Sequence, residues 1–188
     1  MTGVQTCALP ISPIFGDTLF GDEGNDTLIG SPGDDQLTGN GGNDNIQGDD
    51  GADTIYGGAG ADSIDAGAGD DSIRGNAGAD TVNNGDGDDF TLWRVGDGND
   101  LVLDAPGLDD FTMLGTSAAD AFNIGQNLGV MLINVGTETV SVESGSTVIN
   151  INGGAGNDVF NVGDLETIQG LTLNLNGELG RDRYDLDG

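Results

Sequence analysis

The fold is decided by a nine-residue unit that appears in clear form as Gly21–Ile29, GDEGNDTLI. It returns as Gly39–Gln47, GNGGNDNIQ, and as Gly57–Asp65, GGAGADSID. Each copy joins a glycine-rich turn of six residues, which ends in Asp, to a three-residue segment with an aliphatic residue in its middle. A fixed internal period is typical of solenoids, in which each repeat stacks on the next.

An aspartate closes the turn of every unit, at a constant spacing of nine residues. The series is Asp17, Asp26, Asp35, Asp44, Asp53, Asp62, Asp71, Asp80 and Asp89. A glycine precedes the later members by two positions, at Gly24, Gly33, Gly42, Gly51, Gly60, Gly69, Gly78 and Gly87. Another glycine precedes most members by five positions, and Ala66 and Asn84 are the departures.

Two units make one coil, so residues 18 positions apart are expected to lie one above the other in two facing parallel sheets. One inner row is then Leu19, Leu37, Ile55 and Ile73, and the other is Leu28, Ile46, Ile64 and Val82. The stacked aspartates would lie only about 4.8 Å apart. Like charges at this spacing require a cation between them.

Calcium is the cation that suits such turns, because it takes six to eight oxygen ligands from carboxylates and backbone carbonyls. The nine aspartates form seven stacked pairs, so we expect about seven Ca²⁺ ions in this part of the chain. The predicted ligands are the nine aspartates of the series together with backbone at Gly24, Gly33, Gly42, Gly51, Gly60, Gly69 and Gly78. Asp100 and Asp158, which end similar turns, are two further candidates.

The units quoted above resemble the RTX, or haemolysin-type, calcium-binding nonapeptide repeat. The resemblance covers residues 16–104 and implies an all-β fold, a right-handed parallel β-roll with calcium in its turns. It also implies export from a bacterial cell, usually by type I secretion, with folding driven by external calcium. Phe90–Leu103 departs from the regular phase and is expected to end the roll, with Trp93 packing over its last coil.

Residues 105–188 are expected to form a second, strand-rich region, because apolar and polar residues alternate there. Ile149–Gly153, ININGG in its wider context, matches Leu173–Gly177 at an offset of 24 residues. This region looks like the strand-rich calcium-turn repeats of very large bacterial surface proteins. We expect further β-solenoid repeats that continue the stack, and a separate small β-sandwich is the alternative.

Residues 1–15 are predicted to be a non-native or disordered N-terminus. The string MTGVQTCALPI, residues 1–11, resembles the conceptual translation of a sequencing-library adapter, so residues 1–12 are excluded from fold reasoning. The single cysteine, Cys7, lies within this segment, and the native N-terminus is expected to be missing.

Composition excludes several functions. The formal net charge is −29, with four Lys and Arg in total and no His, so a nucleic-acid partner is excluded and common catalytic arrangements lack their residues. No apolar run is long enough to span a membrane. The sequence therefore predicts no enzyme but a calcium-binding structural or spacer module of a secreted or cell-surface protein. The alternative is the calcium-dependent C-terminal tail of a secreted lipase or metalloprotease.

Overall fold

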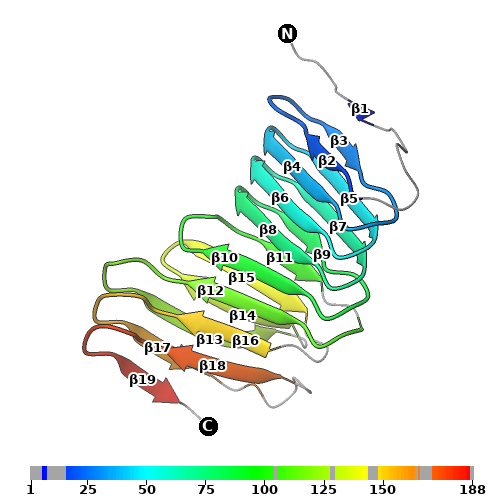
Figure 1. The fold of residues 1–188 in the computed structure, drawn as a ribbon. Coiled ribbons are helices and arrows are strands. Elements are labelled where there is room, and N and C mark those ends of the chain that lie inside the picture. The colour runs from blue at the N-terminus through cyan, green and yellow to red at the C-terminus, as the bar shows by residue number, and fades with distance from the viewer. Residues whose placement is uncertain are drawn as a thin grey trace.

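The computed structural model describes residues 6–7, 16–103, 106–127, 130–143, 148–163, 165 and 171–186. Within these residues the protein consists of strands and turns, without a helix, and the strands form two sheets that face each other along the stack (Figure 1). The predicted all-β solenoid is confirmed. No helix in the described ranges is long and apolar enough to cross a bilayer.

One sheet has eight described strands, all parallel to their neighbours. Their order is β2 (Thr18–Phe20), β4 (Gln36–Gly41), β6 (Thr54–Ala59), β8 (Ser72–Ala77), β10 (Phe90–Arg94), β12 (Asp110–Leu114), β16 (Val148–Asn152) and β18 (Thr172–Asn176).

The facing sheet has eleven described strands. Their order is β1 (Thr6–Cys7), β3 (Thr27–Ile29), β5 (Asn45–Asp50), β7 (Ser63–Ala68), β9 (Thr81–Asn83), β11 (Leu101–Leu103), β15 (Glu138–Glu143), β14 (Val130–Val135), β13 (Ala121–Asn127), β17 (Val159–Val162) and β19 (Arg183–Leu186). Strand β1 comes from the segment predicted to be non-native, and it pairs in parallel with β3.

The 18-residue register of the roll is confirmed. Leu37 lies beside Ile55 in one sheet, and Ile46 lies beside Ile64 in the other. The predicted inner rows form one buried cluster, with Leu19 partly buried at its end. One aliphatic side chain per nine residues is a thin core, so the turns must contribute much of what holds the coils together.

The central strands are longer than the three residues expected from the pattern. β4 to β8 each have six residues, because the first turn residues also pair with the next coil, as Asn40 does with Gly58. Asn40, Asp49 and Asn76, in the second turn position, have φ between 70° and 78°. Asn, Asp and Gly tolerate this left-handed conformation best, which explains why this position holds one of them in every unit between Gly21 and Leu92 except that of Ser31.

The two sheets continue through Phe90–Leu103, where the spacing of stacked aspartates changes from 18 to 20 residues. β10 and β11 continue both sheets, with Thr91 beside Ile73 and Val102 beside Val82. Thr91 takes the inward position that an aliphatic residue holds elsewhere, and it is buried. Trp93 lies inside the core of the following coils rather than over the end of a finished roll.

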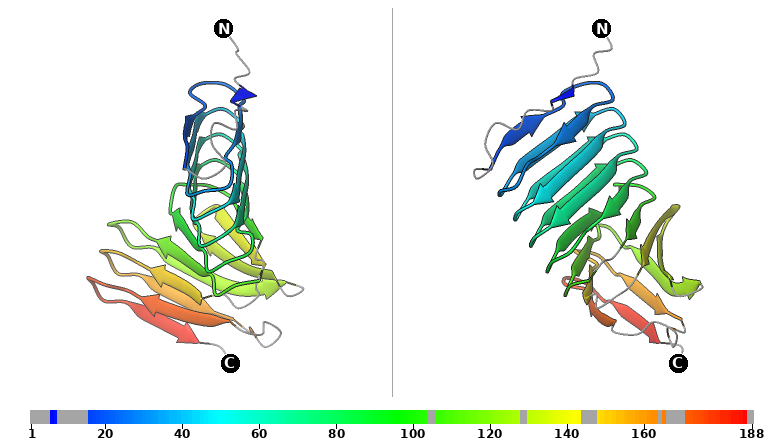
Figure 2. Two further views of the ribbon diagram at one scale, coloured as in Figure 1. Left: turned by 45° about the vertical axis from the view of Figure 1, so that its right-hand side comes forward. Right: turned by 90° about the vertical axis from the view of Figure 1, so that its right-hand side faces the viewer.

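An antiparallel meander, β13–β14–β15, is inserted into the otherwise parallel eleven-stranded sheet, and the sequence analysis did not predict it. β15 pairs in parallel with β11, and β13 pairs in parallel with β17, so the meander keeps the stack continuous. A tight turn at Gly136 and Thr137, with φ of 63° at Gly136, reverses the chain between β14 and β15. The C-terminal coils are broader than the narrow N-terminal roll (Figure 2).

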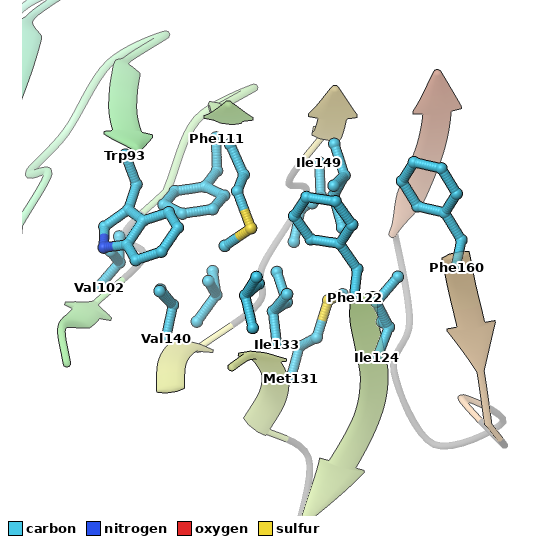
Figure 3. Close-up of a cluster of buried hydrophobic side chains, with 14 residues drawn as sticks. Trp93, Val102, Phe111, Phe122, Ile124, Met131, Ile133, Val140, Ile149 and Phe160 are labelled. Atoms are coloured by element: carbon cyan, nitrogen blue, oxygen red, sulfur yellow. The ribbon is translucent and has the colours of Figure 1, made fainter. Parts of the chain in front are cut away.

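The broader coils enclose a second core with larger side chains (Figure 3). Phe160 is fully buried and stacks between Phe122 and Tyr184, with ring centroids 5.1 Å and 5.0 Å apart. The 24-residue repeat is confirmed, since Ile149 lies beside Leu173 and Phe160 beside Tyr184. The C-terminal region is therefore a continuation of the stack, as predicted.

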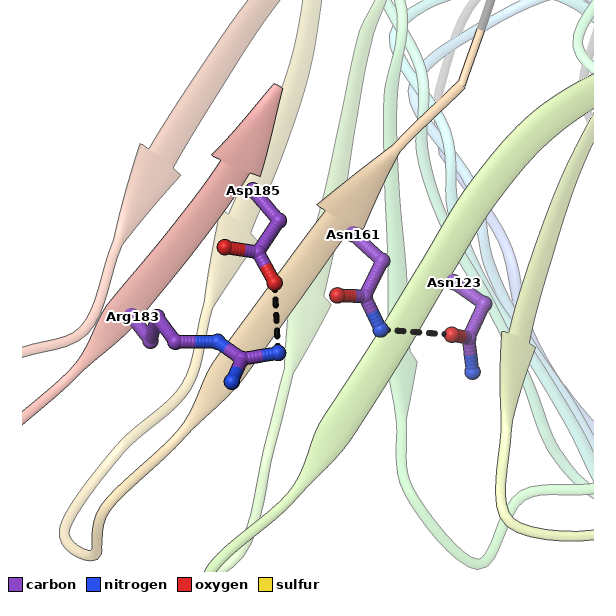
Figure 4. A network of polar contacts seen from close by, with 4 residues as sticks. All are labelled: Asn123, Asn161, Arg183 and Asp185. Atoms are coloured by element: carbon purple, nitrogen blue, oxygen red, sulfur yellow. Dashed lines mark hydrogen bonds and ion pairs between the residues drawn. The ribbon is translucent and has the colours of Figure 1, made fainter. Parts of the chain in front are cut away.

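The outer face of β13, β17 and β19 carries polar side chains in matching rows (Figure 4). Asn161 Nδ2 donates a hydrogen bond of 2.8 Å to Asn123 Oδ1 on the neighbouring strand. On β19, Arg183 and Asp185 form an exposed ion pair of 2.5 Å. Such exposed contacts contribute little stability, so the inner core holds these coils together.

Replacing the central aromatic residue tests this assignment. Phe160→Ala is expected to lower the free energy of unfolding by about 3–5 kcal/mol in saturating calcium, because it leaves a cavity between two rings. Urea denaturation followed by the fluorescence of the single tryptophan measures the loss. Phe90→Ala is the control, because Phe90 is 38% exposed and its loss should cost much less. Equal losses for the two variants would contradict the assignment.

Candidate metal sites in the turns

The aspartates of the repeat lie on top of one another and are joined by hydrogen bonds along the stack. The backbone N–H of Asp44 donates to Oδ1 of Asp62 at 2.8 Å, and that of Asp62 donates to Oδ1 of Asp80 at 2.9 Å. One such ladder comprises Asp17, Asp35, Asp53, Asp71, Asp89 and Asp109. The other comprises Asp26, Asp44, Asp62, Asp80 and Asp100.

The structure thus brings together all nine aspartates of the predicted series and also Asp100. It adds Asp109, which the sequence analysis missed because the spacing from Asp89 is 20 residues instead of 18. Asp100 stands at the same enlarged spacing from Asp80. A Gly-x-Asp signature, Gly107 to Asp109, was the signal available in the sequence.

The second carboxylate oxygen of these residues points inward and is buried. Oδ2 has no hydrogen-bond partner in a set of residues that are at most 3% exposed: Asp44, Asp53, Asp62, Asp71, Asp80 and Asp158. A buried carboxylate oxygen without a partner costs free energy. A bound cation would offset that cost, so these oxygens are the observation that points to a metal.

A first-turn glycine lies beside five of these six oxygens, which approach its backbone too closely to leave room for a side chain, and Ala66 takes this position beside Asp71. A Cβ placed on Gly57 would lie 2.5 Å from Asp62 Oδ2 and 2.6 Å from the carbonyl oxygen of Gly75 in the next coil. The same two kinds of oxygen converge beside Gly39 and Gly48. We call the region between a first-turn residue, the Asp five positions later and the carbonyl of the next coil a cradle.

The donor set of a cradle fits calcium. Carboxylate and carbonyl oxygens are its preferred protein ligands, whereas soft nitrogen and sulfur ligands are absent from these turns. Three or more acidic side chains do not gather at one point anywhere in the described ranges. Backbone carbonyls would therefore complete each site, and calcium accepts them as ligands.

Burial and stacking raise the pKa values of the ladder carboxyls. Burial, together with the negative charges of Asp100, Asp62 and Asp97, raises the pKa of Asp80 to about 7. Burial likewise raises the pKa values of Asp53, Asp71 and Asp100 to about 6. Burial also raises the pKa of Asp62, and Asp44 adds to the effect. The roll therefore resists holding these charges unless a cation compensates them.

The glycines two positions before each Asp have a backbone role. Gly60 has φ of 132°, and a Cβ there would collide with the carbonyl group of Gly42 in the preceding coil. A side chain is therefore excluded at this position, which explains the unbroken series from Gly24 to Gly87. The oxygens that converge on Oδ2 come instead from first-turn residues such as Gly57 and Gly75. Ligation by the series Gly24, Gly33, Gly42, Gly51, Gly60, Gly69 and Gly78 stays a prediction.

A third ladder joins the turns of the C-terminal coils. The N–H of Asp120 donates to Asp158 Oδ1, and the N–H of Asp158 donates to Asp182 Oδ1, both at 2.9 Å. Asp158, a predicted site residue, is fully buried, and Gly153 provides its cradle. Asp120 differs, because its Oδ2 accepts hydrogen bonds from the N–H and the hydroxyl of Thr116.

Where Asn or Asp stands one residue before the ladder Asp, its side chain joins neighbouring turns from outside, as at Asn25, Asp34, Asn43 and Asp70. Asn25 Oδ1 accepts the N–H of Asn43 at 2.8 Å, and Asn43 Oδ1 accepts that of Ala61 at 3.0 Å. These bonds run opposite to those of the buried ladders, since here the earlier coil supplies the side chain. The sequence analysis missed this row, although the recurrence of Asn and Asp at this position was visible in the sequence.

The stacked turns and facing parallel strands define the N-terminal part of the chain as a β-roll, a structural fold rather than a catalytic one. A family comparison identifies the repeats: the model of the RTX calcium-binding nonapeptide repeat matches four times, at residues 15–46, 38–72, 56–90 and 150–164. The roll of this chain is therefore built from RTX calcium-binding repeats, as the sequence resemblance predicted. The fourth match covers the turn of Asp158, in the C-terminal coils. A comparison with curated proteins gives no match.

Proposed function

We propose that this chain is a calcium-folded structural spacer of a secreted or cell-surface bacterial protein. The observation that carries the proposal is the row of buried, partnerless Oδ2 atoms of Asp44, Asp53, Asp62, Asp71 and Asp80, which lie in successive turns of the roll. Bound calcium would neutralise the carboxylates and join successive coils. Asp and glycine residues would hold the ions, while the aliphatic rows pack the interior.

The continuity of the stack supports a spacer. One sheet extends from the roll to β18, and the facing sheet extends through the meander to β19. The spacing of strands is about 4.8 Å, so each added coil lengthens the stack by that amount. Folding that depends on calcium suits export, since the chain would stay unfolded in a calcium-poor cytoplasm and fold outside.

Small-angle X-ray scattering tests the spacer proposal. Calcium is expected to convert the chain from a coil with a radius of gyration of about 45 Å into a rod with roughly half that value. An expanded coil in millimolar calcium would overturn the proposal.

A single neutralising substitution tests the ladder residues. Asp62→Asn keeps the Oδ1 that accepts the N–H of Asp44 but removes the charge facing the cradle. The calcium concentration for half-maximal folding, measured by circular dichroism, is expected to rise about tenfold, equivalent to about 1.4 kcal/mol. Asp50→Asn is the matched control, because Asp50 is exposed and its charge faces solvent. A similar shift in both variants would show that overall charge, not the ladder, governs folding.

A further inference from the structure

The turns of the stack differ in the backbone conformation of their second residue. In the six turns whose aspartate has a buried, partnerless Oδ2, this residue lies in the left-handed region, with φ between 70° and 124°. The six residues are Asn40, Asp49, Gly58, Gly67, Asn76 and Gly154. Ser31 and Thr116 stand at the same position, four residues before Asp35 and Asp120, and neither has a positive φ.

The local sequence explains why these two turns differ. Ser31 precedes Pro32, whose ring pushes the preceding residue towards extended conformations. Thr116 is β-branched, and a β-branched residue rarely adopts a positive φ. The left-handed conformation that Asn, Asp and Gly adopt in the other six turns is therefore disfavoured in both.

The different conformation brings hydrogen-bond donors to the aspartate. The N–H of Ser31 donates to Asp35 Oδ2 at 2.8 Å, and Asp35 is 3% exposed. The N–H and the hydroxyl of Thr116 donate to Asp120 Oδ2 at 2.7 Å and 2.9 Å. The same oxygen accepts no hydrogen bond in the six left-handed turns. Two separate parts of the stack thus satisfy this oxygen from the same turn position.

The turn of Asp35 shows that the added donor is the decisive difference. Asp35 Oδ2 and the carbonyl oxygen of Gly48 converge beside Gly30, as the corresponding oxygens do in the other cradles. Asp35 Oδ1 accepts the N–H of Asp17, so both carboxylate oxygens of Asp35 have a partner. Hydrogen bonds from N–H groups to a carboxylate are among the strong ones in proteins. The unsatisfied buried oxygen that a cation would compensate is therefore missing from this turn.

We infer that hydrogen bonds from Ser31 and Thr116 take the place of calcium in the turns of Asp35 and Asp120, which close without metal. This inference rests on the proposed function, because it assumes that turns with a partnerless Oδ2 bind calcium. Ser31 and Thr116 then determine which turns of the stack are metal sites. The number of bound ions is accordingly smaller than the number of stacked aspartate pairs.

Neutralising single aspartates tests the inference through the number of ions bound in saturating calcium. Native mass spectrometry and isothermal titration measure this number, after circular dichroism has verified that each variant is folded. Asp62→Asn is expected to lower the number by one, whereas Asp35→Asn and Asp120→Asn are expected to keep the wild-type number. Asp62 is a matched reference for Asp35, because both are 3% exposed but Asp62 Oδ2 has no partner.

Restoring the usual second residue is expected to create a site. Thr116→Gly copies Gly154 of the next coil, and Ser31→Asn combined with Pro32→Ala copies Asn76–Ala77. Each of these two variants is expected to bind one more calcium ion than the wild type. Thr116→Ser is the control, because serine keeps both donors, and its ion number should equal that of the wild type.

The outcomes separate this inference from the proposed function. Loss of an ion in Asp35→Asn or Asp120→Asn, as in Asp62→Asn, would overturn the inference. An unchanged ion number in both restored variants would also overturn it. A wild-type chain that binds no calcium at all would instead refute the proposed function.

Discussion

Removing calcium at pH 7.5 is expected to abolish the parallel roll. The far-UV circular dichroism signal of residues 16–103 should be lost, and the emission of Trp93, which is 3% exposed, should shift to longer wavelength. The physical reason is that the aliphatic rows form a thin core, whereas both Asp ladders place like charges in buried positions. Without a cation these charges oppose folding, and metal binding then supplies the folding free energy.

The design of this experiment separates calcium from general ionic effects. Calcium added back in excess of the chelator should restore both signals, whereas magnesium at the same concentration should not, because it requires stricter octahedral geometry and retains water. Sodium chloride at equal ionic strength is a second control, since screening alone acts weakly on buried charges. Unchanged strand signal in a calcium-free sample at pH 7.5 would contradict the proposed role of the ladders.

The repeat made most of the roll predictable from sequence. A strict period fixes which residues stack, so the inner rows and the aspartate ladders followed from counting positions, and Leu37 beside Ile55 is one result. The 24-residue register between Ile149 and Leu173 was found in the same way. Periodicity carries this information because each residue type recurs at the same position in successive coils.

The sequence analysis missed the features that the nine-residue period does not encode. Alternating apolar residues occur in parallel and antiparallel strands alike, so Val130–Val135 gave no sign that β14 runs against its neighbours. Asp109 was missed because two extra residues enlarge its coil. The hydrogen bond between Asn84 and Thr91 depends on two departures within one nine-residue unit, one in the turn and one in strand β10, and only the folded coil brings them together.

Low pH is expected to stabilise the calcium-free roll in part, because protons neutralise the ladder carboxylates as calcium would. Burial raises the pKa values of Asp53, Asp71 and Asp100 to about 6 and that of Asp80 to about 7, from an ordinary value of 3.8. Between pH 3.8 and 7 the folded roll therefore binds more protons than the unfolded chain. Stability of the calcium-free roll then falls as pH rises through this window and increases as pH is lowered.

The measurement is a pH titration of calcium-free protein from 7.5 to 4.5, followed by circular dichroism and Trp93 emission. Calcium should be removed on a chelating resin, because soluble chelators lose affinity for calcium in acid. The concentration of calcium that remains should be measured by atomic emission. Strand signal and tryptophan burial are expected to increase toward pH 4.5, whereas the calcium concentration needed for folding increases as protons compete for the carboxylates. Asp80→Asn removes the carboxyl whose pKa is raised to about 7 and keeps the acceptor for the N–H of Asp62, so it should fold at higher pH without calcium. A calcium-free chain whose strand signal is greatest at pH 7.5 would show that charge repulsion in the ladders is not what keeps the roll unfolded.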